Sequence, residues 1–252
     1  MQTDPEVQFF DEFSEKYGDY DVLGEKTYSL ILDVLQQRCG FPPKGATIAD
    51  MGCGTGAFTR RMAARFDSCE VIGVDISPKQ IDLAQKMVGE GKAVGRYIVG
   101  DITSTNFESN SVDLITYSGV LHHFSERSMR VKVLTEGARI LKPGGSMFSY
   151  DPNLHSPSMW LYRHPNSPLC SKEGKTENEV LLSREQMEEE VREAGLSRID
   201  TRALSGIYFC FVEGSFARKV LPLYNLYEWL IHVSLLESRL GTFVVMSAQK
   251  SP

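Results

Sequence analysis

The sequence lacks long apolar runs. No stretch reaches the roughly 18 consecutive apolar residues that a membrane-spanning helix requires, so no membrane span is expected. Its first residues, Met1-Gln2-Thr3-Asp4-Pro5-Glu6, are acidic and have no apolar core, so we expect no signal peptide. Cysteine is also scarce: the five cysteines are scattered, and neither C-x-x-C nor H-E-x-x-H occurs. These absences indicate free thiols, a cytoplasmic location and no metal site.

Basic residues are not in excess either. The chain has 27 Lys and Arg against 33 Asp and Glu, which gives a net charge of -6. This balance argues against a surface that coats nucleic acid, so we expect a small-molecule partner and no nucleic acid. With 252 residues the chain can bury one sizeable core. We therefore expect a single domain over residues 1–252, as a monomer or a homodimer.

The sequence does contain a buried strand followed by a glycine turn and a helix. Ile48–Met51 is a short apolar run that only Asp50 interrupts. Gly52, Gly54 and Gly56 follow, and glycines let the backbone take positive φ and come close to a ligand. The helix after them is indicated by an apolar residue every four positions, at Phe58, Met62 and Phe66. A strand that turns through glycines into a helix N-terminus is typical of a nucleotide-type pocket.

A second strand, 71–75, ends in Asp75, which lies 21 residues after Gly54. An acid at about that distance commonly takes a ribose hydroxyl. The glycine pattern is G-x-G-x-G, whereas dinucleotide enzymes carry G-x-G-x-x-G. Asp50 would repel a pyrophosphate pressed on the turn, but it suits a ligand with an amino group and a sulfonium. An NAD(P)-dependent oxidoreductase stays the alternative among enzymes.

Four short sequence blocks follow one another between about Ile48 and Asp151, and their order and spacing match those of a known family. They are Asp50-Met51-Gly52-Cys53-Gly54-Thr55-Gly56, Val74-Asp75-Ile76-Ser77, Gly100-Asp101-Ile102 and Leu141-Lys142-Pro143-Gly144-Gly145. On these blocks the sequence resembles the class I S-adenosylmethionine-dependent methyltransferases, and in particular the small-molecule enzymes of the type 11 kind.

The resemblance implies an α/β fold with a Rossmann-like, seven-stranded, mostly parallel sheet. The last strand is antiparallel, helices cover both faces, and helical inserts form a cap. The apolar runs predict strands at 48–51, 71–75, 96–100, 111–117, 146–150, 198–204 and 242–249. The expected parts of the domain are an N-terminal helical lid (1–40), a cofactor-binding core (41–151) and two substrate or cap inserts (152–182 and 206–241).

The resemblance also implies the cofactor, S-adenosyl-L-methionine, and its product, S-adenosyl-L-homocysteine. By likeness, Asp50, Gly52 and Gly54 hold the methionine end and Asp75 holds the ribose. Asp101 binds the adenine amine, with Ile102 packed on the ring. The remaining expected cofactor contacts are Cys53, Ile76, Ser118 and, as a lid residue on the N-terminal helix, Tyr17. For Tyr17 a packing role is equally compatible with the sequence, and for the nearby phenylalanines packing is favoured.

Two adjacent histidines follow the fourth predicted strand, at the sheet edge where open α/β sheets bind ligands. Because consecutive side chains point in different directions, at most one is expected to face the methyl group. We choose His123 over His122 as the base or positioning group, by likeness to the family's L-H-H-F-type segment. Asp151, just past the fifth strand, is a substrate-side candidate, although it could instead cap the turn at Pro152-Asn153.

The two inserts decide the acceptor. No N-P-P-Y segment follows the fourth strand, where Ser118-Gly119-Val120-Leu121 stands instead, so methylation of nucleic-acid bases is disfavoured. Residues 216–236 are apolar almost all round and should be covered by something. A cap over the core or a dimer face is favoured, and an apolar substrate tunnel or an interfacial membrane helix is the alternative.

These features together predict methyl transfer from S-adenosylmethionine to a small, apolar or lipid-like acceptor. From another class, the chain could bind the cofactor without catalysis, as a regulatory or interaction module. The sequence does not name the acceptor or say whether its atom is O, N or C.

Overall fold

The computed structural model describes residues 5–18, 21–91, 94–167, 170, 176, 178–210 and 215–252, and it contains one seven-stranded sheet. The strands are β1 (Thr47–Met51), β2 (Glu70–Asp75), β3 (Arg96–Val99), β4 (Val112–Ser118), β5 (Leu141–Pro152), β6 (Ser197–Leu204) and β7 (Phe243–Gln249). Their order is β3-β2-β1-β4-β5-β7-β6, and β7 runs antiparallel to both of its neighbours. This confirms the predicted mostly parallel sheet with an antiparallel last strand.

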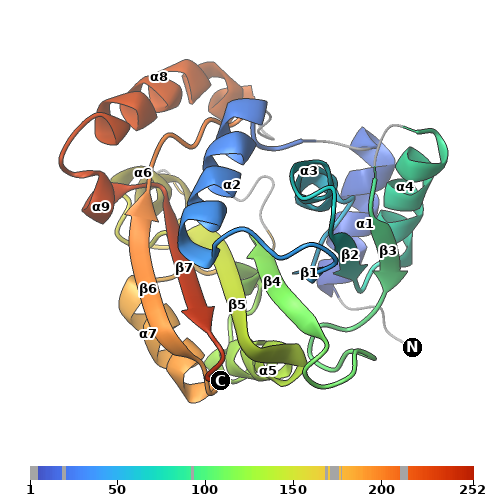
Figure 1. The fold of residues 1–252 in the computed structure, drawn as a ribbon. Coiled ribbons are helices and arrows are strands. Elements are labelled where there is room, and N and C mark those ends of the chain that lie inside the picture. The colour runs from blue at the N-terminus through green and yellow to red at the C-terminus, as the bar shows by residue number, and fades with distance from the viewer. Residues whose placement is uncertain are drawn as a thin grey trace.

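Helices cover both faces of the sheet (Figure 1). They are α1 (Pro5–Tyr17), α2 (Glu25–Cys39), α3 (Ala57–Arg65), α4 (Pro78–Gly89), η1 (Leu121–His123), α5 (Arg127–Ile140), α6 (Pro157–Arg163), α7 (Arg184–Glu193), α8 (Ser215–His232) and α9 (Glu237–Leu240). In β1, Ile48 packs with side chains of α2 and α3, whereas its neighbour Ala49 packs with α5 and α7. Successive strand residues point to opposite faces, so both must be apolar in a sheet covered on both sides.

The N-terminal helix α1 is fixed to α4 by polar side chains at the start of α4. Ser77 caps α4, and its hydroxyl accepts from the Gln80 amide. The Gln80 side chain donates to the Phe10 carbonyl (2.9 Å) and contacts Ser14, both on α1. Gln80 therefore holds α1 against the start of α4.

The strand predicted at 146–150 lies inside β5, which begins earlier, at Leu141, directly after α5. The first part of β5 is irregular: Gly144 has a φ of 78°, and the residues from Leu141 to Ser146 stand opposite Val112 to Leu114 of β4. The glycines pair with the end of the chain, since Gly144 donates to the Lys250 carbonyl and Lys250 donates to the Gly145 carbonyl.

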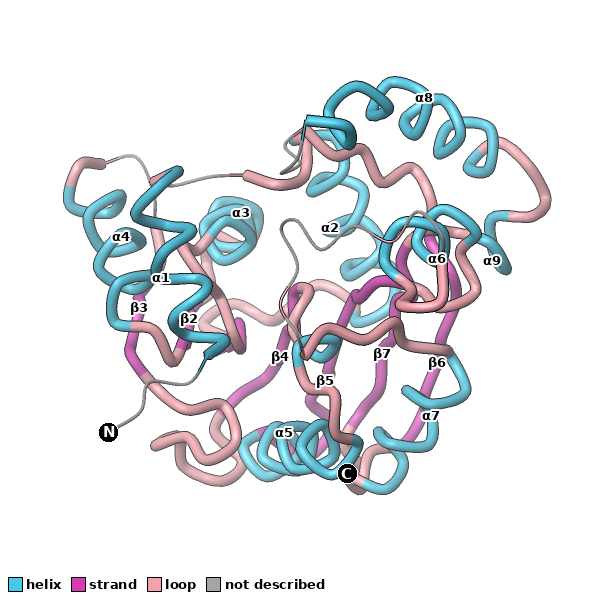
Figure 2. Tube along the Cα trace, turned by 180° about the vertical axis from the view of Figure 1, so that it is seen from behind, coloured by secondary structure: helices cyan, strands magenta, loops and turns pink. Residues whose placement is uncertain are grey.

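The inserts lie together at one end of the sheet. Figure 2 shows α6, α8 and α9 on the same side of the molecule, beyond β5 and β7. Parts of the predicted inserts, 168–169, 171–175, 177 and 211–214, lie outside the described residues. None of the described helices combines the length and the apolar character needed to cross a membrane.

Candidate active site

The turn after β1 can be made only with glycine at two positions. Gly52 has a φ of 75°, and a Cβ atom there would lie 2.7 Å from the Val120 side chain. Gly56 has a φ of 84°, and a Cβ atom would lie 2.5 Å from the Tyr97 ring. Positive φ disfavours other residues, and neither side chain could give way cheaply inside the packed core. The turn thus brings bare backbone to the carboxyl edge of the sheet.

Asp75 connects this turn to the end of β2. Its Oδ2 accepts from the Gly54 amide (2.8 Å) and its Oδ1 accepts from the Ser77 amide (2.9 Å). Burial raises the pKa of Asp75, and these two backbone hydrogen bonds oppose the rise. The carboxylate lines the cavity described below, so it can both hold the turn and meet a ligand hydroxyl.

Asp50, which was expected to hold the methionine end of the cofactor, lies behind the turn. It is fully buried, and its oxygens accept from the hydroxyls of Thr59 (2.6 Å) and Thr116 (2.8 Å). Burial raises the pKa of Asp50 to about 6 against the effect of those two hydrogen bonds. Since Asp50 is not among the described residues that line the cavity, its position supports the turn rather than a direct contact.

A cavity of about 1090 Å³ opens at the carboxyl edge of the sheet. Its wall includes parts of the glycine turn, of the loops after β2, β3 and β4, and of α1, α6 and α8. Open α/β sheets place their ligand sites at this edge. Most of the predicted site residues line it: Gly52, Cys53, Gly54, Asp75, Ile76, Asp101, Ile102, Ser118, His122 and His123.

The lid helix reaches the cavity through its phenylalanines. Phe9, Phe10 and Phe13 line the wall, whereas Tyr17 is not part of it and packs on Phe13, with 4.6 Å between ring centroids. The sequence left a ligand contact and packing equally open for Tyr17, and it favoured packing for the phenylalanines. In the structure the phenylalanines line the cavity, because α1 crosses it with its first turns.

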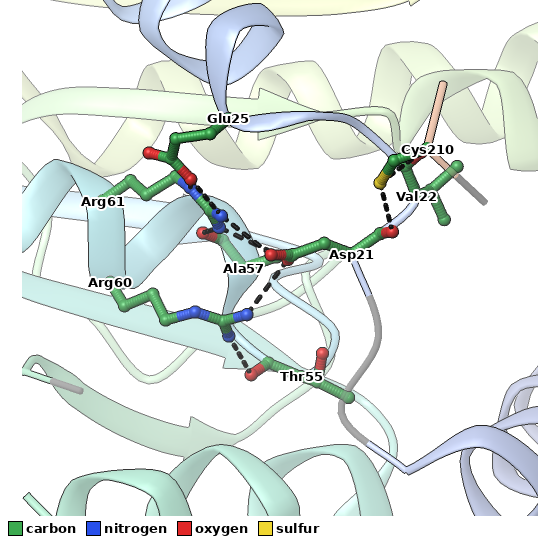
Figure 3. Close-up of polar contacts among 8 residues, drawn as sticks. All are labelled: Asp21, Val22, Glu25, Thr55, Ala57, Arg60, Arg61 and Cys210. Atoms are coloured by element: carbon green, nitrogen blue, oxygen red, sulfur yellow. Dashed lines mark hydrogen bonds and ion pairs between the residues drawn. The ribbon is translucent and has the colours of Figure 1, made fainter. Parts of the chain in front are cut away.

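A network of charges fixes the linker between α1 and α2 over the glycine turn (Figure 3). Asp21 pairs with Arg60 (3.0 Å) and Arg61 (2.7 Å) at the start of α3, and Arg60 donates to the Thr55 carbonyl. The Cys210 thiol donates to the Asp21 carbonyl (3.1 Å), and burial raises the pKa of that thiol. This network joins three distant segments and brings the neighbouring residues Val22 and Leu23 into the cavity wall.

His122, rather than His123, is joined to the buried acid. Its Nδ1 lies 2.9 Å from Asp151 Oδ1, which also accepts from the His122 amide (3.1 Å). Asp151 is fully buried, and its Oδ2 has no hydrogen-bond partner among the described residues. Burial and His123 lower the pKa of His122, while Asp151 raises it. A neutral His122 with its proton on Nδ1 leaves Nε2 as an acceptor.

His123 lies beside this pair rather than in it. Its ring centroid is 4.0 Å from that of His122 and 5.1 Å from that of Phe10 on the lid. The sequence alone did not single out Glu179, which also lines the cavity and pairs with Arg163 (3.5 Å). Ligating atoms of His122, His123 and Glu179 lie within 4.8 Å of one another, which is a set that could hold a metal ion.

Known methyltransferases resemble this chain in sequence. Residues 49–149 match the family model of the methyltransferase domain. The O-methyltransferase cnsE of Penicillium expansum is 25% identical over 203 residues, which cover 75% of this chain and 70% of that protein. The probable tRNA methyltransferase 9B of Homo sapiens is 28% identical over 155 residues, which cover 60% of this chain and 31% of that protein. This chain thus spans about a third of the length of the tRNA methyltransferase relative.

A solved structure gives the same fold over the full length of the chain. It is the SAM-dependent methyltransferase of Thermotoga maritima, described as a possible histamine N-methyltransferase. The TM-score is 0.65 at 17% sequence identity, and the superposition covers 97% of this chain and 99% of that protein. Residues 49–149 thus resemble the methyltransferase domain family, and these findings together support a class I S-adenosylmethionine-dependent methyltransferase. The NAD(P)-dependent alternative finds no support among these proteins.

The cavity also has an aromatic wall, here called the aromatic half, which begins at Phe58 on α3, the helix after the glycine turn. Phe58, Tyr150 and Phe243 pack in a row, with ring centroids 5.6 Å and 5.4 Å apart. Phe209 and Tyr224 continue the row at 5.4 Å. All five residues line the cavity. The sequence did not reveal this wall, because its members are far apart in the chain and each reads as an ordinary core residue.

Proposed function

We propose that this methyltransferase transfers the methyl group of S-adenosylmethionine to a small, apolar acceptor. The observation that carries the proposal is that one cavity has both the glycine turn and the row of five aromatic residues in its wall. Pockets lined by aromatic side chains with few polar groups suit apolar ligands. The O-methyltransferase among the relatives and the demethylmenaquinone methyltransferase of Thermotoga maritima, 28% identical over 153 residues, agree with this class of acceptor.

The cofactor is assigned to the turn end. The backbone of Gly52 to Gly54 would face the methionine part, and Asp75 would accept from the ribose hydroxyls. Asp101 uses one oxygen for the Thr103 amide (2.8 Å), which leaves its other oxygen for the adenine amine. Ile102 lines the cavity next to it and offers the ring an apolar surface. S-adenosylhomocysteine, the product, would occupy the same contacts.

For methyl transfer, the main task of the protein is to align the acceptor atom with the methyl group. The cofactor supplies a methyl group that its sulfonium already activates, so holding the acceptor in line provides much of the rate. His122 Nε2 accepts the proton that a hydroxyl or amine acceptor releases as its O or N atom bonds to the methyl carbon. Asp151 holds His122 in the required tautomer and stabilises the imidazolium that forms. This assignment prefers His122 to His123 as the base.

Nucleic acid is the competing acceptor, because some relatives are named as tRNA methyltransferases. Against it stand the apolar cavity and the net charge of -6. Proteins that bind tRNA usually carry a cluster of Lys and Arg residues that contact the phosphates.

The test is to incubate the purified protein with S-adenosylmethionine labelled in its methyl group. Separate reactions receive hydrophobic phenols and amines, a lipid extract, or tRNA. Label is then counted in the solvent-extractable fraction and in precipitated RNA. The proposal predicts label in the extractable fraction, and a strong loss in His122→Asn. Label in RNA alone, or in neither fraction, would overturn it.

A further inference from the structure

Helix α8 carries a row of uncovered apolar side chains, here called the outward stripe. Its members recur every three or four residues, which places them on one helix face. Each is between 50% and 68% exposed, whereas single exposed apolar residues elsewhere are scattered. The outward stripe consists of Leu223, Leu226, Trp229, Leu230 and Val233. The described part of this chain does not cover this face, so the expectation that something covers residues 216–236 stays a prediction.

The opposite face of α8 is anchored, so the orientation of the helix is fixed. Glu228 is fully buried; it accepts from the Thr242 hydroxyl and from the Ile207 amide. The Tyr224 hydroxyl donates to the Ile207 carbonyl at 3.2 Å. Figures 1 and 2 both show α8 at the periphery of the molecule, with no other helix or strand on its outer side. Because the inner face of α8 is anchored in this way, the outward stripe faces away from the protein core.

Among the described side chains of α8, the exposed charged groups are cations. Lys219 is exposed near the start of the helix, next to Arg218 and one turn before Leu223. Glu228 is the only acid between residues 218 and 236, and it is buried on the inner face. In a chain of net charge -6, this surface is apolar with a cationic end. An anionic lipid surface complements both properties, because headgroups attract the cations while tryptophan and leucine enter the boundary with the acyl chains.

The stripe is continuous with the cavity. Leu223 is 68% exposed and also lines the cavity. On α6, Leu161 combines exposure with a place in the cavity wall in the same way, and the exposed Trp160 precedes it. Apolar side chains of α6 and α8 therefore belong both to the outer surface and to the cavity wall.

We propose that α8 docks the enzyme on an anionic bilayer surface, from which a membrane-resident amphiphile enters the cavity past Leu223. The part about the acceptor rests on the proposed function, whereas the docking itself does not. A second copy of the chain is the less suitable occupant, because its α8 offers the same cationic end and no exposed acid to pair with it. The helix lies on the membrane and does not span it.

The test is co-sedimentation of the full chain with phosphatidylcholine vesicles, with and without phosphatidylglycerol. The variant L226Q/L230Q removes two members of the outward stripe. Its matched control is V94Q/V99Q, at two residues that are each 53% exposed and lie at the β3 edge, far from α8. The single variant Lys219→Glu probes the charge. Circular dichroism and Tm verify that every variant folds.

We expect the wild type and V94Q/V99Q to sediment with the phosphatidylglycerol vesicles and to be released by added salt. L226Q/L230Q should lose at least roughly tenfold in vesicle affinity, and Lys219→Glu should lose several-fold on anionic vesicles only. A wild type that stays in the supernatant with both vesicles would overturn the docking, even if methyl transfer to soluble acceptors is found. A dimer that L226Q/L230Q converts to a monomer, without vesicle binding, would assign the stripe to a second copy instead.

Discussion

Asp75 is the side chain on which the cofactor end of the cavity most depends, since it holds two backbone amides and faces the ligand. Replacing Asp75 with Ala removes the acceptors for Gly54 and Ser77 together with the ribose contact. We expect the Kd for S-adenosylhomocysteine to rise roughly 30- to 100-fold, which corresponds to about 2 to 3 kcal/mol. Isothermal titration calorimetry measures this directly, with Asp67→Ala, on the loop after α3, as the control. An unchanged Kd would remove Asp75 from the site.

The pair His122 and Asp151 makes a prediction about pH. The base form of His122 is required, and its pKa lies below the usual 6.5, so kcat should rise through that lowered value and stay level at neutral pH. Asp151→Asn removes the charge that raises this pKa. The acidic limb of the profile should therefore move to lower pH, while kcat falls roughly 10- to 100-fold.

The control for this pair is His155→Asn, a loop histidine that is not among the residues lining the cavity. It should leave the profile unchanged. If Asp151→Asn lowered kcat without moving the acidic limb, Asp151 would be a packing residue rather than one that positions His122.

Individual site residues could be predicted from the sequence where the residues that position them are close in the chain. The glycine turn and Asp75 lie within the consecutive elements β1, α3 and β2, and the structure brings them together. The direction of the Asp50 side chain could not be predicted, because it depends on Thr116, 66 residues further along the chain. The choice between the two histidines likewise depends on Asp151, 29 residues away. No pattern around a histidine reveals a partner at that distance.

Among the elements, α8 carries the most unusual buried group. Burial raises the pKa of Glu228 from 4.5 to about 7, although hydrogen bonds from Thr242 and Ile207 oppose the rise. Because the folded-state pKa is the higher one, the unfolded chain loses this proton first as the pH increases. The free energy of unfolding therefore falls between about pH 4.5 and pH 7, by about 2 to 3 kcal/mol from this group.

Glu228→Gln removes that titration. Its free energy of unfolding relative to the wild type should increase by about 2 to 3 kcal/mol between pH 5 and pH 8. Urea denaturation at the two pH values measures the difference. The same relative stability at both would mean that Glu228 is already ionised in the folded protein.

The strands were predictable because each is an apolar run of the right length between turn residues. The start of β5 was not, because Pro143 and the two glycines after it normally mark a turn rather than part of a strand. The backbone does bend there, with a φ of 78° at Gly144. Pairing of Gly144 and Gly145 with Lys250, near the other end of the chain, nevertheless joins the segment to the sheet.

For the whole molecule, we expect the methyl donor to bind at the glycine turn (the donor half of the cavity) and the acceptor to bind at the aromatic half (the acceptor half). Leu221→Trp, on the α8 wall, should narrow the acceptor half. We expect the Kd of S-adenosylhomocysteine to change less than about twofold, and kcat/KM for the larger acceptors to fall at least roughly tenfold, since added bulk in a filled pocket displaces ligand. Leu226→Trp, at an exposed position of the same helix, is the matched control. An equal loss for donor and acceptor would mean that the two halves are not separate.

The sequence could predict the donor half but not the acceptor half. The donor half comes from one contiguous core, whereas the aromatic half joins α3, β5, β7, α8 and the 206–210 segment. Only the folded arrangement brings Phe58 and Phe209 to one wall. The substrate inserts were therefore visible as segments, but not as a surface with a defined chemistry.

The most direct test of this division is a crystal structure of the complex with S-adenosylhomocysteine. The account predicts that the ribose hydroxyls lie within hydrogen-bond distance of Asp75 and that the sulfur faces the space before His122. The row from Phe58 to Phe209 should stay free of the ligand. A ligand held by that aromatic row, or a sulfur directed away from His122, would contradict the account.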